Sequence, residues 1–235
     1  MRLAIDTSTS IASLALCQED EVVTELTWCC GQNHTVTLLP HLAKLLSQNG
    51  LELRALSGIV VAKGPGSFNG LRVGISTAKG LALGLGIPIA GISTLEAAAY
   101  QHAETGLPVC SILNAGRGEI ATAIYQMQNG DWQQVMPEQI TTLAALSSQI
   151  TTRTIFCGEL NAETVSQLNR NLKQPAIIAT PAASLRRAGF LAELGQKKLA
   201  TGSGDDPATL QPTYLRRPNI TKPKKQLGWG GHSGH

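Results

Sequence analysis

The order of apolar segments in this chain repeats, and the repeat limits the possible architecture more than any other feature. Three short strand-like segments, the first at residues 3–5, precede an amphipathic helix at about 34–48, a strand at 59–62 and a helix at about 71–85. Much the same order restarts with a strand at 109–113. Alternating strands and helices predict a sheet with helices on its faces. We therefore expect two similar α/β units.

A duplicated unit of this order is typical of actin-like ATPases and sugar kinases, an analogy of fold that says little about chemistry. The predicted fold class is a duplicated actin-like ATPase fold (ASKHA, ribonuclease H-like), with two lobes of mixed sheets and flanking helices. We expect residues 1–104 to form the N-terminal lobe and residues 105–200 the C-terminal lobe. Residues 201–235 are rich in Gly, Pro and basic residues, which predicts a tail that is flexible after about residue 217.

Bulk composition favours a protein of the cytoplasm. Hydrophobic residues make up 43% of the chain and charged residues 15%, which is enough for a buried core. Asp6 interrupts the first apolar run, and no stretch reaches the roughly 18 apolar residues of a membrane span. The five cysteines show no framework spacing, which favours reduced thiols. We expect a cytoplasmic protein with no membrane contact.

Charge is unevenly distributed along the chain. The net charge is +3. Five basic residues and no acidic ones follow from position 216, so the rest of the chain carries 3 − 5 = −2. The basic residues are Arg216, Arg217, Lys222, Lys224 and Lys225. Such a tail can contact nucleic acid phosphates, or it can be a solvated end without a partner.

Three turns are candidate sites for a phosphate or a metal, and each departs from the pattern that the chemistry needs. The turn after Asp6 has no glycine before Ile11, which hinders close approach of a phosphate. The loop at residues 64–70 continues with Leu-Arg where a phosphate-binding loop has Lys-Ser or Lys-Thr. The turn of the second unit begins with Asn114, where an ATPase of this fold needs a carboxylate for Mg²⁺. We predict no catalytic residues, no metal site and no cofactor.

Small residues recur every four positions on the second long helix and form one ridge. The ridge contains Gly70, Gly74, Ala78, Ala82 and Gly86. Each interior glycine costs about 1 kcal/mol of helix stability relative to alanine, so close packing against the ridge has to compensate. That packing can come from a partner's helix or from this chain's own sheet, and the sequence leaves both open.

Five blocks, taken in order, resemble the TsaB family. They are residues 3–9 (LAIDTST), His34 with residues 38–40, residues 64–72 (GPGSFNGLR), residues 78–82 (AKGLA) and residues 212–216 (PTYLR). The resemblance spans residues 1 to about 217. The Gly-Pro-Gly-Ser-Phe block is specific, and the ordered set is more so.

The resemblance implies a scaffold or dimerisation subunit and not an enzyme. The complex it would serve transfers the threonylcarbamoyl group from threonylcarbamoyl-AMP to N6 of adenosine 37 in tRNAs that read ANN codons. The implied partners are a TsaD-like catalytic subunit, a TsaE-like ATPase and, through the complex, tRNA. A homodimer is an alternative when the chain is alone.

In the family, pairing uses helices of the N-terminal lobe, which match residues 34–48 and 71–85 here. The partner interface that we expect consists of Leu38, Leu42, Gly70, Gly74, Ala78 and Ala82. Two departures from the family pattern stand out. Asn69 replaces the usual Thr, and Asn114 replaces the Asp that usually begins the second turn. The second change puts a Mg²⁺ or nucleotide role in doubt.

Two other classes of function compete with the scaffold. An actin-like small-molecule kinase or ATPase needs a Mg²⁺ carboxylate near position 114, where the sequence has Asn. A glycoprotease-type metallopeptidase needs two histidines four residues apart on a helix, and His34 and His41 do not have that spacing.

Overall fold

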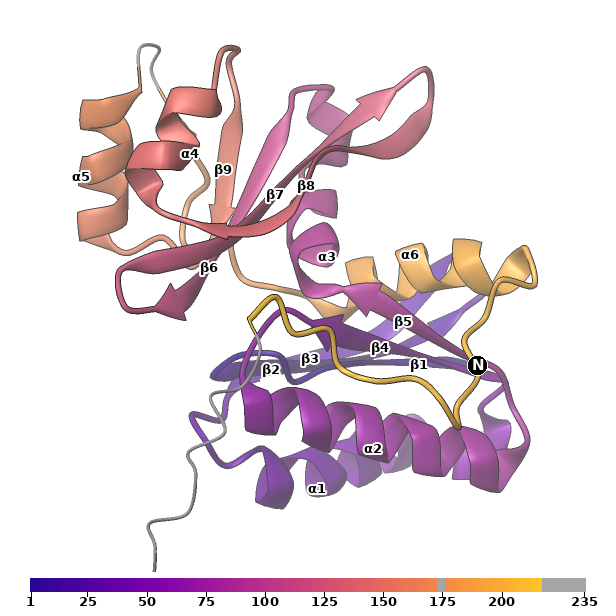
Figure 1. Cartoon of the computed structure of the whole chain (residues 1–235). Coiled ribbons are helices and arrows are strands. Elements are labelled where there is room, and N and C mark those ends of the chain that lie inside the picture. Colours follow the sequence, from indigo (N-terminus) through magenta and orange to yellow (C-terminus); the bar gives the residue numbers. More distant parts are fainter. Residues whose placement is uncertain (173–175, 217–235) are drawn as a thin grey trace, which may run out of the picture.

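The computed structural model describes residues 1–172 and 176–216, and Figure 1 shows that they form two lobes. The N-terminal lobe has a five-stranded sheet in the order β3-β2-β1-β4-β5. Its elements are β1 (Arg2–Asp6), β2 (Ile11–Gln18), β3 (Glu21–Cys29), α1 (His34–Gln48), the short 3-10 helix η1 (Leu53–Ala55), β4 (Gly58–Gly64), α2 (Phe68–Leu85) and β5 (Ile89–Ser93).

The C-terminal lobe has a five-stranded sheet in the order β10-β9-β6-β7-β8. The remaining elements are α3 (Thr94–Tyr100), the short η2 (Ala103–Thr105), β6 (Val109–Gly116), β7 (Glu119–Gln128), β8 (Asp131–Thr141), α4 (Leu143–Gln149), β9 (Ile155–Gly158), α5 (Ala162–Asn171), β10 (Ile177–Ile178) and α6 (Ala188–Ala200).

The two sheets share one connectivity. β1 pairs antiparallel with β2 and parallel with β4. β6 likewise pairs antiparallel with β7 and parallel with β9. Both sheets are therefore mixed and follow the same order of elements. This confirms the predicted duplicated fold.

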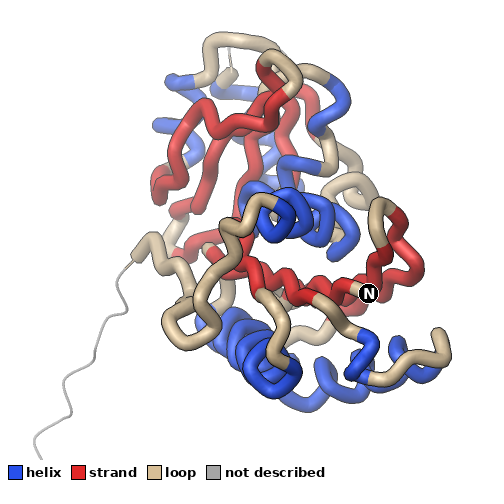
Figure 2. Tube along the Cα trace, turned by 90° about the vertical axis from the view of Figure 1, so that its right-hand side faces the viewer, coloured by secondary structure: helices blue, strands red, loops and turns tan. Residues whose placement is uncertain are grey.

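Alternating side chains of the central strands supply two cores in the N-terminal lobe, because successive residues of a strand point to opposite faces. Leu3 and Ile5 lie in the core under α1 and α2. Ala4 and Val60 lie in the core under α6, which covers the other face of the sheet (Figures 1 and 2). A Cβ added at Gly195 of α6 would overlap the Val60 side chain, so this helix sits close against the strands.

The chain returns to the N-terminal lobe at its end, which corrects the domain boundary predicted at residue 200. α6 contacts β1, β2, β4 and β5 of the first sheet. After it, Asp205 donates its backbone N–H to Ile89 O (2.8 Å), and Thr213 donates to Lys63 O (2.6 Å). Residues 188–213 therefore pack on the N-terminal lobe. The predicted flexible end, after about 217, lies outside the described residues.

Two helix starts also differ from the prediction. α2 begins at Phe68 and not at residue 71, because the Ser67 side chain accepts a hydrogen bond from Gly70 N–H (3.3 Å) and caps the helix. The sequence also predicts a last helix over residues 183–199, and in the structure this helix, α6, begins at Ala188. α3 follows β5 directly and contacts β4, β6 and α6, so it lies between the two sheets.

Candidate functional site

Two glycines, one in the loop before α2 and one in its first turn, hold this segment against the first turn of the chain. A Cβ at Gly66 would overlap the Ser8 carbonyl oxygen, and a Cβ at Gly70 would overlap the Thr7 carbonyl oxygen. Hydrogen bonds join the same segments: Ser67 N–H donates to Ser8 O (2.6 Å), and Thr7 Oγ1 donates to Gly70 O (2.8 Å). The glycine-rich block therefore serves packing within the chain.

Asp6, at the end of β1, is fully engaged by this chain's own groups. Its Oδ1 accepts hydrogen bonds from Ser8 N–H (2.8 Å) and the Ser8 hydroxyl (2.5 Å). Its Oδ2 is paired with Nε of Arg186 at 3.1 Å, and both side chains are buried. The same guanidinium donates to Thr9 Oγ1 and to Ile11 O (3.3 Å). An arginine of this chain thus fills the turn after β1.

His34 begins α1 and is a structural residue. Its side chain is buried, and Nε2 donates to Thr9 O at 2.7 Å, because a carbonyl oxygen can only accept. This contact ties α1 to the first turn. Within residues 1–172 and 176–216, no group of three or more His, Cys, Asp or Glu side chains is placed to hold a metal ion.

The turn between β6 and β7 is stabilised without a free carboxylate at position 114. The Asn114 side chain accepts from Gly116 N–H (2.7 Å), and Glu159 accepts from Asn114 N–H (2.8 Å). Glu119 forms an ion pair with Arg216 and not with its neighbour Arg117. The sequence leaves open a local ion pair between Arg117 and Glu119, a contact of either with a partner, or a role in stabilising the turn, and the local pair does not form among the described residues. The pair that forms ties the end of the described chain to the C-terminal lobe.

The structure places the six predicted interface residues inside the N-terminal lobe, which corrects that prediction. Leu38, Leu42, Ala78 and Ala82 are at most 3% exposed, and Gly70 and Gly74 are buried as well. A Cβ at Gly74 would overlap the Thr7 side chain. The ridge therefore faces the chain's own sheet and first turn, and a partner cannot reach it.

The outward side of α1 and α2 carries a different set of small and apolar residues, which we call the outer face. Large apolar side chains there are Val36 (68% exposed), Leu39 (55%), Phe68 (41%) and Leu83 (61%). Ser76, Gly80 and Gly84 are also exposed and recur every four residues along α2. A Cβ at Gly80 or Gly84 would meet nothing within 4 Å. Figure 1 shows the two helices side by side below the sheet.

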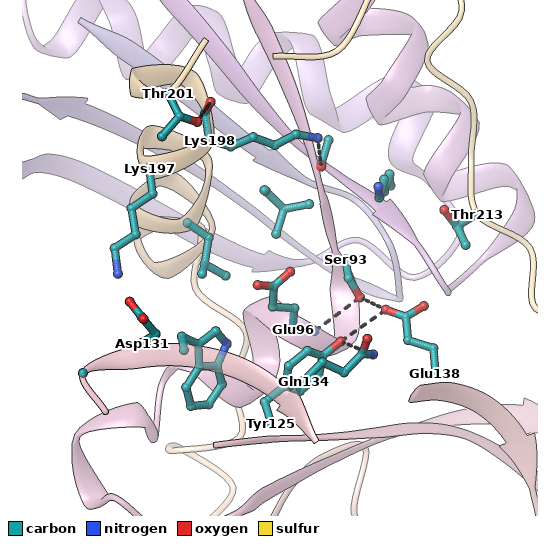
Figure 3. Close-up of a pocket in the computed structure, with 16 residues that line it drawn as sticks. Ser93, Glu96, Tyr125, Asp131, Gln134, Glu138, Lys197, Lys198, Thr201 and Thr213 are labelled. Atoms are coloured by element: carbon teal, nitrogen blue, oxygen red, sulfur yellow. Dashed lines mark hydrogen bonds between the residues drawn. The ribbon is translucent and has the colours of Figure 1, made fainter. Parts of the chain in front are cut away.

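A cavity of about 960 Å³, which we call the junction cavity, opens between the two lobes (Figure 3). Glu138 of β8 accepts hydrogen bonds there from Ser93 Oγ and from the Tyr125 hydroxyl (3.3 Å). Burial raises the pKa of the Glu96 carboxyl, and the nearby Glu138 raises it further. Burial likewise raises the pKa of Tyr125. Sequence reasoning missed this site, because its residues come from α3, β7, β8 and α6 without a local motif.

A second cavity, of about 800 Å³, lies in the cleft between the first turn and the segments that flank α5. Its lining includes Thr9, Leu160, Val165 and Ile178, with Arg186 at the wall. The guanidinium that pairs with Asp6 thus forms part of this cleft.

No helix of the described residues is long and apolar enough to cross a membrane.

Two matching mixed sheets, each with a polar turn between its first two strands, define a protein of the actin-like ATPase fold class. Component A of (R)-2-hydroxyglutaryl-CoA dehydratase from Acidaminococcus fermentans shares this fold, with a TM-score of 0.52 at 13% identity over 85% of this chain and 98% of that chain. A family model described as TsaD, tRNA N6-adenosine threonylcarbamoyltransferase, matches residues 29–220.

Relatives with higher sequence identity show which family of this fold class the chain belongs to. The tRNA threonylcarbamoyladenosine biosynthesis protein TsaB of Bacillus subtilis (strain 168) is 36% identical over 217 residues, which cover 91% of this chain and 93% of that protein. The solved structure of YeaZ from Pseudomonas aeruginosa has a TM-score of 0.78 at 26% identity and covers 91% of this chain and 99% of that one. The chain belongs to the TsaB family, which confirms the resemblance read from the five sequence blocks.

Proposed function

We propose that this protein is a scaffold subunit in the formation of threonylcarbamoyladenosine on tRNA, and that it binds and supports a TsaD-like catalytic subunit. The names of its relatives supply the pathway. The observation that carries the scaffold role is the outer face of α1 and α2. Exposed apolar side chains that gather on one side of a lobe mark a surface for contact with another protein. Val36, Leu39 and Leu83 supply that surface here.

The small residues of the outer face, Ser76, Gly80 and Gly84, form a row that suits a helix as the contacting element. Gly80 and Gly84 each weaken α2 by about 1 kcal/mol relative to alanine, and neither packs against anything in the chain. A helix that approaches closely along Ser76, Gly80 and Gly84 offsets this cost. A TsaD-like subunit is the proposed occupant. Because a TsaD model matches this chain over residues 29–220, that subunit is expected to present equivalent helices of its own.

The first turn supports a role without catalysis. A scaffold has no need of a free Asp6 carboxylate, and here Arg186 neutralises it inside the protein. The neutral Asn114 leaves the second turn without the carboxylate that Mg²⁺ prefers. We propose that the TsaD-like subunit supplies the metal and the transfer, and that a TsaE-like ATPase and tRNA join through the complex. The free cysteines support a reducing, cytoplasmic setting.

The test replaces one apolar side chain of the outer face by a charged one. Leu39→Glu should weaken binding of the TsaD-like subunit from the same organism at least about tenfold, since loss of a buried apolar anchor costs about 2 kcal/mol. The affinity is measured by calorimetry. Formation of the modified nucleoside in the reconstituted system should fall with it. The thermal stability of the variant alone should stay close to wild type, because position 39 is exposed.

Val135→Glu is the matched control, because Val135 is an exposed valine on β8 of the other lobe (42% exposed). It should leave both affinity and nucleoside formation unchanged. Full binding and activity of the Leu39→Glu variant would show that the outer face is not the interface. Turnover of ATP by the purified chain alone, lost in Asp6→Ala, would favour the kinase or ATPase alternative.

A further inference from the structure

The junction cavity contains polar groups that the protein itself leaves unused. The Glu96 carboxylate takes part in no hydrogen bond or ion pair among residues 1–172 and 176–216. Glu138 uses Oε1 for Ser93 and Tyr125, and its Oε2 has no partner in the same residues. Two carboxylate groups thus face one cavity with acceptor capacity to spare. A bound ammonium group would use that capacity.

An aromatic side chain lines the same cavity. The indole ring of Trp132 lines the cavity, while its Nε1–H is buried and has no hydrogen-bond partner among the described residues. Its ring is held by the Tyr125 ring, stacked at 5.8 Å between centroids, and by the Tyr100 ring at 5.6 Å. This side chain is therefore a rigid part of the wall, and its indole signal reports on a ligand in the cavity.

A lysine stands on the α6 side of the cavity (Figure 3). Lys197 Nζ donates to the Tyr100 hydroxyl at 3.1 Å. An ammonium group has three N–H donors, so two remain for a ligand. The neighbouring Lys198 is committed to Asp205 at 2.7 Å. Lys197 therefore adds to the lining a positive charge with donors to spare.

The charges that line the cavity balance. Three side chains are acidic and three are basic: Glu96, Asp131, Glu138, Lys63, Lys197 and Lys198. Lys198 is already paired with Asp205 outside the lining, so the lining still presents groups of both signs, and a ligand that carries one charge of each sign can meet both. The volume, about 960 Å³, suits a small organic molecule.

We propose that the junction cavity binds a small zwitterion of the α-amino acid type. Glu96 and Glu138 hold its ammonium group, Lys197 holds its carboxylate, and the Trp132 ring lines the wall beside it. Lys197 belongs to α6, which packs on the N-terminal sheet, and Glu96 belongs to α3 between the two sheets, whereas Trp132 and Glu138 belong to β8 of the C-terminal sheet. The ligand therefore contacts both lobes and stabilises their arrangement. The site is distinct from the outer face and does not depend on the scaffold role.

Nuclear magnetic resonance of the full chain tests this directly, with L-serine, L-leucine, isopentylamine and 4-methylpentanoate as probes. The last two are L-leucine without its carboxylate and without its amino group. We expect the indole N–H signal of Trp132, identified by its loss in Trp132→Phe, to shift saturably with at least one of the two amino acids. The two truncated probes should bind at least about tenfold more weakly than L-leucine, because each lacks one charge-assisted contact.

Two variants assign the ends of the ligand. Glu96→Gln should weaken L-leucine binding about tenfold or more, and so should Lys197→Met, at an exposed position where folding is not at stake. Glu163→Gln, on α5 and outside the cavity lining, is the matched control and should bind L-leucine as the wild type does. Isopentylamine binding should fall in Glu96→Gln and persist in Lys197→Met. The absence of a saturable shift with either amino acid overturns the proposal. Equal binding of L-leucine and isopentylamine also overturns it.

Discussion

Arg186 and Asp6 are separated by 180 positions in the chain, yet their side chains form a buried ion pair with Nε and Oδ2 3.1 Å apart. Asp6 ends the first strand, and Arg186 immediately precedes the segment that leads into α6. The pair therefore fixes the point at which the chain returns from the C-terminal lobe to the N-terminal one. It also occupies the turn that follows β1, where the guanidinium meets Thr9 and Ile11 as well.

Arg186→Leu should destabilise the protein by about 3–5 kcal/mol, because it leaves the Asp6 carboxylate buried without its partner. Urea unfolding measures this loss. Arg187→Leu is the control at the next position, where the side chain is 52% exposed and pairs with Glu25 at 2.7 Å. That change should cost less than about 1 kcal/mol. Equal losses from the two variants would contradict a special role for the buried pair.

Two glycines of α2 should respond in opposite directions to the same substitution. Gly74→Ala should destabilise the chain by about 1–3 kcal/mol, because the new methyl group overlaps the Thr7 side chain. Gly80→Ala should stabilise it by about 0.5–1 kcal/mol, because the helix gains propensity in open space. Thermal melting of the free chain measures both. A stabilised Gly74→Ala variant would mean that Gly74 does not pack against Thr7 as described.

The sequence predicted the fold class because its evidence was periodic and occurred twice. The apolar runs of β1, β4 and β6 and the long helices α1 and α2 are visible in the order of residues, and the duplicated order limits the topology. The predicted end of the C-terminal lobe was wrong, because α6 follows the second unit in sequence while its apolar side packs on the first sheet. No local pattern reveals to which sheet a terminal helix returns.

The prediction of which side of α2 meets a partner was wrong for a related reason. Small residues every four positions occur on two sides of this helix, one through Gly74 and one through Gly80. The choice between them depends on which side meets Thr7, a contact between distant parts of the chain. Arg186 and the junction cavity were missed because their residues meet only after folding.

Thiol reactivity should single out one of the five cysteines. Cys29 is exposed, whereas Cys17, Cys30, Cys110 and Cys157 are buried. Burial raises the pKa of Cys17 to about 11 and that of Cys110 to about 12, so little thiolate forms at these sites near neutral pH. A colorimetric disulfide reagent should show one fast phase of one thiol per chain, which Cys29→Ser abolishes. Two or more fast thiols in the native protein would contradict the burial seen here.

The Glu96 carboxyl should make stability depend on pH in a direction opposite to that of a paired carboxylate. Burial, with a contribution from Glu138, raises its pKa in the folded protein above the ordinary value of 4.5. The folded state therefore binds the proton more tightly than the unfolded state does. The contribution of protonated Glu96 to the free energy of unfolding is complete below pH 4.5 and is lost as pH rises through the raised pKa. Glu96→Gln stays neutral, so its stability relative to wild type should increase over this interval.

Asp205→Asn provides the control of opposite sign. Partial burial works to raise the pKa of Asp205, but hydrogen bonds from the Lys198 ammonium and Gly91 N–H outweigh it and lower the pKa below 3.8. Its ionised form therefore stabilises the fold above pH 3.8, and that contribution is lost as pH falls through the lowered pKa. Asp205→Asn should be less stable than wild type at neutral pH, and the difference should shrink in acid. Urea unfolding of the three proteins over a pH series measures both trends. A constant difference between Glu96→Gln and wild type across the series would show that Glu96 ionises in the folded protein as it does in the unfolded chain.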